Sequence, residues 1–426
     1  MKLKKSLTFL DLLVYGIGVI VGAGIYVLIG ISAGLAGNLI WLSFILASLI
    51  SIFTGLSYAE LSSVFPKEAA EYFYFKNIFK NKFAAFLVGW ISLIAQIVGL
   101  AAVSIGFANY FSFITHINPL LVSSSLIIFV GVINFLGAKE SSNFNFFLTG
   151  IAILGLLLII ILSFYSGNIF TINYFETDSL KNVLKAAALI FFAFIGFEGI
   201  VNIAEEVKNP TKNVPRALIW SIVITTILYM LIGIASVSTV NYKELSVSQA
   251  PLALVASKLL GDYGFYLVSF AALFSTASTV LVLSIVSSRI LWGMARDNSL
   301  PKIFSKLFSK TQTPFVSIFT ITLVSLLLVL LLQKIDIIAE IANFNMLLVY
   351  LLVNFSLIYF RLEQKKFGKF KSPLNIGRIP LSAVFGFIVI VLLFTFLSKV
   401  SILLGIAGLV LGAVVFYLEN YRRKIK

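Results

Sequence analysis

Apolar residues occur along this chain in long continuous runs, which short, charge-bearing segments separate. A helix that crosses a membrane needs about 20 apolar residues, and about twelve runs approach or exceed that length. The runs are continuous rather than alternating, so they predict helices and not the strands of a membrane barrel. They lie at 8–34, 38–64, 82–112, 118–138, 143–166, 182–204, 214–240, 262–294, 313–333, 336–361, 379–398 and 400–420.

The composition identifies lipid as the main solvent of the chain. Of its 426 residues 60% are hydrophobic and 12% are charged, whereas a soluble domain carries about 25% charged residues. This excludes a soluble enzyme, a nucleic-acid-binding protein and a disordered protein. The chain has no cysteine and one histidine, His116, so we expect no metal site and no cofactor.

The basic residues predict the orientation of the chain. With the N-terminus placed in the cytoplasm, 26 of the 32 lysines and arginines fall in segments on the cytoplasmic side. Cytoplasmic loops carry such an excess. We therefore expect an even number of spans, both termini in the cytoplasm, and a location in the cell membrane. The net charge of +15 is then mainly a signal for orientation and for lipid headgroups.

Two of the runs contain glycine-rich interruptions. The first covers residues 16–25 and the second covers residues 192–199. They lie in the first and sixth runs. This offset of five predicts two five-helix repeats, 1–166 and 167–361, that enter the membrane from opposite sides. Residues 362–426 would add two helices and a tail. The alternative is that these glycines only let helices pack closely.

An interrupted helix presents free backbone groups that suit a zwitterion. A half-helix that starts near Ala23–Ile25 would direct N–H groups and a positive dipole end at a carboxylate. A half-helix that ends near Phe194 would leave free carbonyl groups for an ammonium group. The simplest zwitterion of this size is an α-amino acid.

Several motifs recur in the order found in one known family. Residues 22–25 match its G-[SA]-G-I motif, and residues 57–74 match the end of its second helix and the re-entrant loop that follows. Further matches cover residues 192–198, 205–217 and 289–301. The chain resembles the amino acid–polyamine–organocation (APC) superfamily of amino acid permeases. Ala69 and Ala70 stand where many members have two glycines.

The resemblance implies an all-α, leucine-transporter-type fold with ten core helices in two inverted repeats, discontinuous helices 1 and 6, and two more helices. It also implies alternating access about a central site. The substrate carboxylate would meet N–H groups of helix 1, and its ammonium group would meet carbonyl groups of helices 1 and 6. Phe192 would be an aromatic gate over the substrate. The implied substrate-binding residues are Val19, Ile20, Gly22, Ala23, Gly24, Ile25, Phe192, Phe194, Ile195 and Gly196.

Charged residues near these interruptions are candidates for coupling and gating. Glu198 lies inside an apolar run, where a charge is costly and so marks a functional candidate. The resemblance implies a proton or gating role, and the alternative is a protonated Glu198 bonded to a free carbonyl. Glu205 and Glu206 could close a gate through ion pairs with Arg289 and Arg296.

The coupling ion stays open at this point. Some relatives place a lysine in the middle of helix 5, but residues 141–166 contain none, and the matching position is Ala152. Helix 8 offers four hydroxyl groups that could bind Na⁺ or bond back to their own helix. They belong to Ser275, Thr276, Ser278 and Thr279. Proton coupling through Glu198 is the second possibility.

The function predicted from these features is secondary active transport of amino acids. Glu198 is the one charged residue expected near the side-chain pocket, which favours neutral or apolar substrates. The alternatives are an exchanger or facilitator without ion coupling, and a transporter of cationic amino acids or polyamines. Three other classes are disfavoured because the sequence lacks the features they need. An enzyme would need a catalytic constellation of side chains, and a channel would need a polar stripe along a helix. A primary pump would need a P-loop or a phosphorylation motif.

Overall fold

A computed structural model describes residues 3–166, 170–177, 179–248, 250–331, 335–363, 368–395, 397 and 399–425. Within these ranges it describes the backbone but not the side chains of residues 23, 27, 113, 192, 335–340 and 423–425. The described chain is helical apart from one short hairpin, in which β1 (Asn375–Ile376) pairs antiparallel with β2 (Ile379–Pro380).

The long helices follow the apolar runs, and several short helices lie between the runs. In chain order they are α1 (Phe9–Ile20), α2 (Ala23–Ala36), η1 (Gly37–Leu39), α3 (Ile40–Val64), α4 (Ala70–Phe79), α5 (Lys82–Thr115), α6 (Pro119–Leu136), α7 (Ala138–Tyr165), α8 (Leu180–Phe191), η3 (Phe192–Phe194), η4 (Phe197–Glu206), α9 (Pro210–Thr239), α10 (Tyr242–Val247), α11 (Pro251–Leu260), α12 (Asp262–Arg296), η5 (Lys302–Ser305), α13 (Phe315–Leu331), α14 (Ile335–Glu363), α15 (Leu381–Phe394) and α16 (Lys399–Ile425).

Nine helical stretches in the described part of the chain are long and apolar enough to cross a membrane. The prediction of an all-helical chain with many membrane spans is confirmed. Many large apolar side chains point outward, among them Leu403, Val410 and Leu154. In lipid such positions need no polar cover, because the surrounding tails are as apolar as the side chains.

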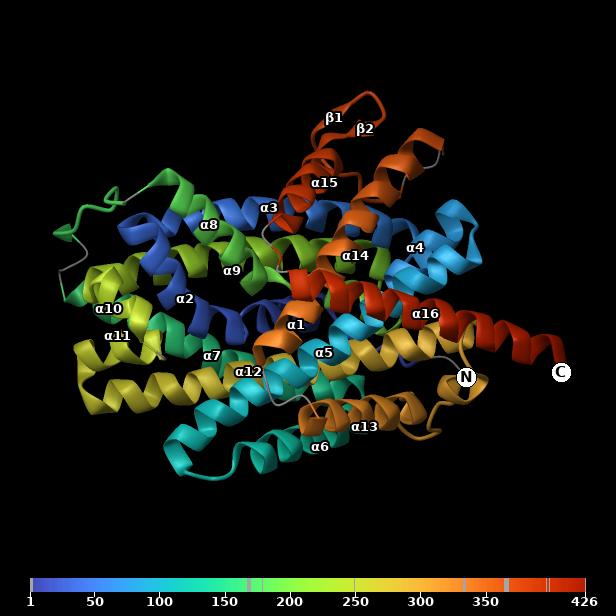
Figure 1. Ribbon diagram of the computed structural model, residues 1–426, viewed down its shortest axis with the longest axis horizontal. Helices are drawn as coiled ribbons and strands as arrows, with labels where there is room; N and C mark the ends of the chain where they lie inside the picture. The colour runs from blue at the N-terminus through green and yellow to red at the C-terminus, as the bar shows by residue number, and fades with distance from the viewer. Residues whose placement is uncertain are drawn as a thin grey trace.

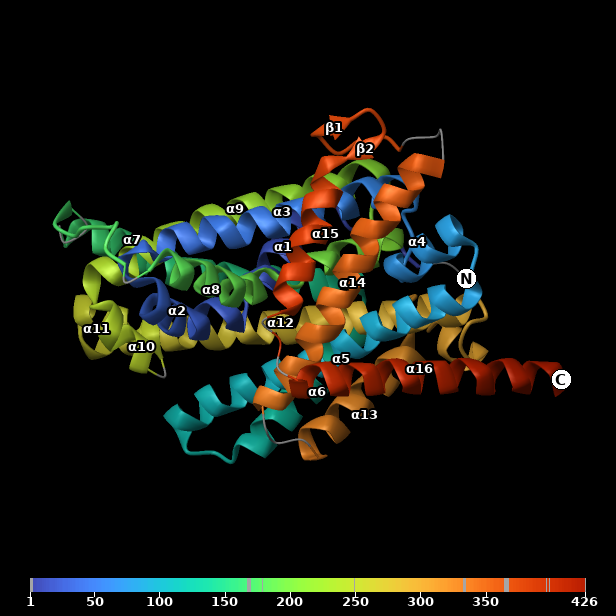
Figure 2. The ribbon, with the colours of Figure 1, turned by 45° about the horizontal axis from the view of Figure 1, so that its top comes forward.

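The interrupted helices lie in the middle of the bundle. α3 and α9 lie side by side along one face, and α12 lies against α5 and α7 on the other (Figure 1). α1 packs between these layers against α7, α9, α12 and η4. α16 runs along the outside and carries the C-terminus beyond the other helices, as Figure 2 also shows. The long apolar helices therefore surround the two helix interruptions.

Both interruptions predicted from glycine lie between helical segments. α1 ends at Ile20 and α2 begins at Ala23. In the second, α8 passes into the short 3₁₀ segments η3 and η4, with Gly196 between them at φ +119°. A side chain there would be strained, and a Cβ on Gly196 would come within 2.8 Å of Val19 Cγ2.

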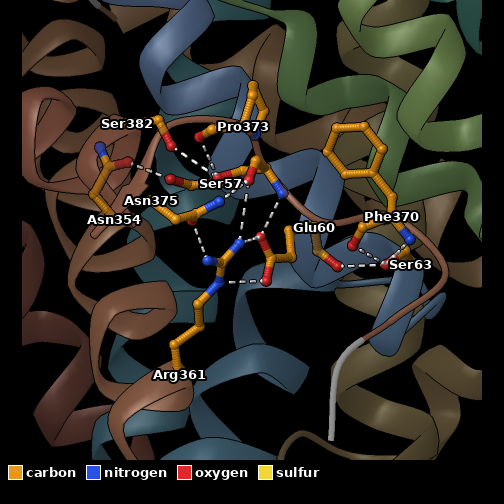
Figure 3. Close-up of polar contacts among 10 residues, drawn as sticks. Ser57, Glu60, Ser63, Asn354, Arg361, Phe370, Pro373, Asn375 and Ser382 are labelled. Atoms are coloured by element: carbon orange, nitrogen blue, oxygen red, sulfur yellow. Dashed lines mark hydrogen bonds and ion pairs between the residues drawn. The ribbon is translucent and has the colours of Figure 1, made fainter. Parts of the chain in front are cut away.

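An ion pair with no exposed surface joins α3 to α14 at one end of the bundle (Figure 3). Arg361 Nε donates to Glu60 Oε1 at 2.7 Å, and both side chains are fully buried. The backbone N–H of Ser372 donates to the other Glu60 oxygen at 2.8 Å. Arg361 also bonds Asn375 in the hairpin. Glu60 thus joins α3 to α14 and fixes the segment that leads into α15.

We expect Glu60→Gln to lower the free energy of unfolding by about 3–5 kcal/mol, because it leaves a buried guanidinium without its counter-charge. Glu244→Gln is the matched control, since the Glu244–Lys258 pair is about half exposed and an exposed pair contributes about 1 kcal/mol or less. Thermal unfolding in detergent micelles measures both. Equal melting temperatures for the two variants would contradict a stabilising role for the buried pair.

Candidate functional site

The two helix interruptions touch each other. A Cβ on Gly24, in the first turn of α2, would come within 2.8 Å of Ala193 Cα in η3. A Cβ on Gly22 would come within 2.4 Å of Thr279 Oγ1 on α12. Neither distance leaves room for a side chain, so these glycines allow the two interruptions and α12 to meet.

A cavity of about 90 Å³ lies where they meet. Its walls come from both interruptions and from α5, α12 and α14, and they are mostly apolar. Glu198 is the one charged side chain among the described residues that line it, and Gln96, Thr279 and Asn343 add polar groups. The predicted site residues that line the cavity are Val19, Ile20, Gly22, Gly24, Ile195, Gly196, Glu198 and Thr279.

Other predicted site residues do not line this cavity. Ile25 is buried, and the ring of Phe194 packs edge-on against Tyr229 with 5.2 Å between the ring centroids. The side chains of Ala23 and Phe192 lie outside the described part of the structure, so the gate expected at Phe192 stays a prediction.

Tyr229 on α9 binds carbonyl groups of both interruptions. Its hydroxyl donates to Ile20 O at 2.6 Å and lies 3.4 Å from Ala193 O. The carbonyl of Ile20, which the sequence offered to an ammonium group, therefore has a protein donor already. A carbonyl oxygen has two lone pairs and keeps capacity for a second donor. Sequence reasoning missed Tyr229, for which the only signal was a tyrosine in the middle of an apolar run.

Glu198 is fully buried and accepts hydrogen bonds from three directions. Gln96 Nε2 on α5 donates at 2.9 Å, and the backbone N–H of Gly196 donates at 2.9 Å. The hydroxyl of Tyr350 on α14 also donates to it. The carboxyl group thus connects the second interruption to two neighbouring helices. Gln96 and Tyr350 were not found from the sequence, because both lie in apolar runs without a recognisable motif.

The hydroxyl groups of α12 divide into two kinds. Thr276 donates to Ala272 O at 3.0 Å, and Thr279 donates to Ser275 O at 3.2 Å, so both bond within their own helix. Ser275 instead donates to Val21 O at 2.5 Å, and Ser278 lies 3.4 Å from Gly18 O. Of these four hydroxyl groups, only those of the two serines lie within hydrogen-bond distance of carbonyl groups in the first interruption.

The region around Ala152 is uncharged. Ala152 is fully buried, and its carbonyl accepts a hydrogen bond from Tyr26 at 3.1 Å. One turn away, Thr149 lies 3.1 Å from Ser278, which also donates to Asn145 at 2.7 Å. At the position where the resemblance implied a lysine in some relatives, the described structure has hydroxyl and amide groups.

At the far end of η4, two ion pairs connect this segment to α12. Glu205 forms a two-bond pair with Arg296, and Lys67 lies 3.8 Å from it. Glu206 pairs with Arg289 at 2.7 Å, with both side chains almost fully buried. From the sequence we expected ion pairs among these four residues without assigning the partners. We also expected Glu205 and Arg289 to be gating residues. In the structure those two belong to different pairs.

The sequence of this multi-pass helical membrane protein matches a known family over nearly its whole length. The family model for amino acid permeases matches residues 7–418. The chain belongs to this amino acid permease family of the APC superfamily, and it is accordingly a transporter and not an enzyme.

Curated relatives carry names with different substrates. The branched-chain amino acid permease BcaP of Bacillus subtilis is 29% identical over 99% of this chain and 94% of its own length. The methylthioribose transporter of the same organism is 28% identical with the same coverage. The cationic amino acid transporter 1 of Arabidopsis thaliana is 28% identical over 84% of this chain, and the match spans 63% of that relative.

We expect Gly24→Leu to abolish amino acid binding, because its side chain would occupy the contact between α2 and Ala193. Gly150→Leu is the matched control, since a Cβ on Gly150 meets nothing within 4 Å. Binding of a radiolabelled amino acid to purified protein measures the effect, and size-exclusion chromatography checks that each variant is folded. A folded Gly24→Leu variant with unchanged affinity would show that binding does not involve this contact.

Proposed function

We propose that the protein is a secondary active transporter of neutral, mainly apolar amino acids. It would work by alternating access about the cavity between the two helix interruptions and α12, which are the first, sixth and eighth of the predicted spans. One observation carries this proposal: two interrupted helices expose backbone groups at a mostly apolar cavity. Such sites, built from discontinuous helices at the interface of two repeats, are typical of secondary transporters.

The proposed topology has twelve spans. Beyond the nine long helical stretches, the segment formed by α8, η3 and η4, together with the shorter α13 and α15, supplies the other three. Residues 1–166 and 167–361 would be the inverted repeats, and 362–426 the last two helices and the tail. The distribution of basic residues supports cytoplasmic termini in the cell membrane.

The substrate carboxylate would bind at the start of α2. The N–H groups of Ala23, Gly24 and Ile25 lie in the first turn of this helix, so no preceding helical turn offers them a carbonyl acceptor. The ammonium group would bind carbonyl oxygens of Val19, Ile20 and the residues before Gly196. The apolar walls would take the side chain. The name of BcaP supports a branched-chain substrate.

Cationic amino acids or polyamines are the second candidate, because Glu198 lines the cavity and several relatives are named for cationic substrates. The neutral class is favoured because three donors already occupy the Glu198 carboxyl group. Glu198 is then the candidate for proton coupling. Ser275 and Ser278, with carbonyl groups of α1, are the candidates for Na⁺. Exchange without ion coupling is the third possibility.

Counterflow in proteoliposomes tests the substrate. We expect leucine, isoleucine and valine to exchange, and arginine and putrescine not to compete. The decarboxylated analogue 3-methylbutylamine should compete about 10–100-fold more weakly than leucine, since losing charged hydrogen bonds costs about 1.5–3 kcal/mol. If the amine competed as well as leucine, the carboxylate assignment at α2 would be wrong. Competition by arginine alone would favour the cationic class.

A second experiment tests the coupling ion. Leucine uptake is measured with a proton gradient and with a sodium gradient, applied separately, in wild type and Glu198→Gln. We expect uptake to follow the proton gradient in wild type and to lose that dependence in the variant. Proton-driven uptake that survives the substitution would exclude Glu198 as the proton site. Uptake driven by sodium alone would move the coupling site to Ser275 and Ser278.

A further inference from the structure

Besides Glu198, a second buried carboxyl group forms no ion pair in the described structure, and it does not line the cavity. Glu71 is in the first turn of α4, the short helix that follows α3 and lies outside the candidate membrane spans. Its side chain is 1% exposed. The helix is held against η4 because the backbone N–H of Ala70 donates to Asn202 Oδ1 at 2.9 Å.

Only one of the two Glu71 carboxyl oxygens has a hydrogen-bond partner. Oε1 accepts from Tyr58 at 3.1 Å and from Asn202 Nδ2 at 3.1 Å. Oε2 is buried and has no partner among the described residues. An ionised carboxylate in that position would leave a buried acceptor unsatisfied, which is costly. A protonated carboxyl group removes the charge.

The groups around Glu71 supply no positive charge. They are the hydroxyl groups of Tyr58 on α3, Tyr74 on α4 and Tyr350 on α14, together with Glu198 and Asn202 on η4. No lysine or arginine in the described chain forms an ion pair with it. Burial raises the pKa of Glu71 to about 7, and the nearby charge of Glu198 acts in the same direction. The group therefore exchanges a proton near neutral pH.

Glu71 and Glu198 are connected through shared neighbours. The amide of Asn202 donates to Glu71 and also lies 3.2 Å from the backbone carbonyl of Glu198. The ring of Tyr58 packs edge-on against the ring of Tyr350 at 5.9 Å, and the two hydroxyl groups bond Glu71 and Glu198 respectively. Two buried acids this closely linked disfavour simultaneous ionisation.

We propose that Glu71 is a second proton-binding site, which receives the proton that Glu198 releases and passes it to the solvent on the side of the α4 loop. One proton leaves the Glu198 carboxyl group, the Glu71 carboxylate takes it up, and water accepts it when the loop is hydrated. The proposal rests on the proposed function, in its proton-coupled form. Glu71 does not line the cavity, so it carries protons without contacting the amino acid.

Proteoliposomes that trap a pH indicator test this role. The membrane potential is clamped, leucine is added outside, and internal acidification is recorded beside leucine counterflow at equal pH. Exchange needs no proton release, so we expect Glu71→Gln to keep counterflow within about twofold of wild type. Its leucine-driven acidification should fall at least about tenfold. Glu71→Asp should restore acidification, since it keeps an acid at this position.

Tyr74→Phe is the matched control, because it removes a buried hydroxyl beside Glu71 that has no hydrogen-bond partner among the described residues. It should acidify like wild type. Wild-type acidification in Glu71→Gln would overturn the proposal. So would joint loss of counterflow and acidification that Glu71→Asp does not restore, which would indicate a structural role. Counterflow without acidification in wild type would overturn the proton path and leave amino acid transport intact.

A measurement without substrate separates this inference from the transport assignment. Infrared difference spectra of the purified protein, recorded between pH 5 and 9, detect protonated carboxyl groups. We expect a band that titrates near pH 7 in wild type, is absent in Glu71→Gln and is shifted in Glu71→Asp. Identical spectra for wild type and Glu71→Gln would overturn the proton site, even if leucine were found to be the wrong substrate.

Discussion

The structure depends on hydrogen bonds to the backbone N–H and C=O groups that become free where two helices are interrupted among apolar helices. Lipid offers no hydrogen bonds, so such groups must find partners within the protein or in a bound molecule. Tyr229 and Ser275 donate to carbonyl groups of the first interruption, and Glu198 accepts from the N–H of Gly196 in the second. Under the proposed function, the first N–H groups of α2 bind the carboxylate of the substrate. The same requirement therefore sets both the packing of the core and the chemistry of the cavity.

Four buried carboxyl groups show two arrangements with different consequences. Glu60 with Arg361, and Glu206 with Arg289, are paired with an opposite charge and fasten helices to each other. Breaking such a pair is costly, which suits a fixed frame. Glu198 and Glu71 have neutral donors instead of cations. Without a counter-charge their proton affinity responds to hydration and to neighbouring charge, which suits groups that load and release protons during transport.

The bend before α4 differs in this chain from the glycine pair that the family resemblance leads one to expect. Ala69 stands where many members have glycine and adopts a left-handed conformation with φ +52°. A residue with a Cβ accepts this geometry at a cost of roughly 1–2 kcal/mol. A Cβ on Gly293 of α12 would come within 2.9 Å of Ala69 Cβ, so that glycine makes room for it. The bend that presents Glu71 to η4 is thus retained without the usual glycine pair.

Hydrophobicity alone indicated the long apolar helices and the number of runs, because lipid selects for composition over each stretch of about 20 residues. Glycine patterns located both interruptions, and motif order indicated the family. Only the tertiary structure decided which polar groups meet. Gln96 and Glu198 are 102 residues apart, and Tyr229 and Ile20 are 209 apart. Such contacts leave no periodic trace in the sequence. They arise because close packing of the helices leaves each buried polar group only the partners that happen to face it.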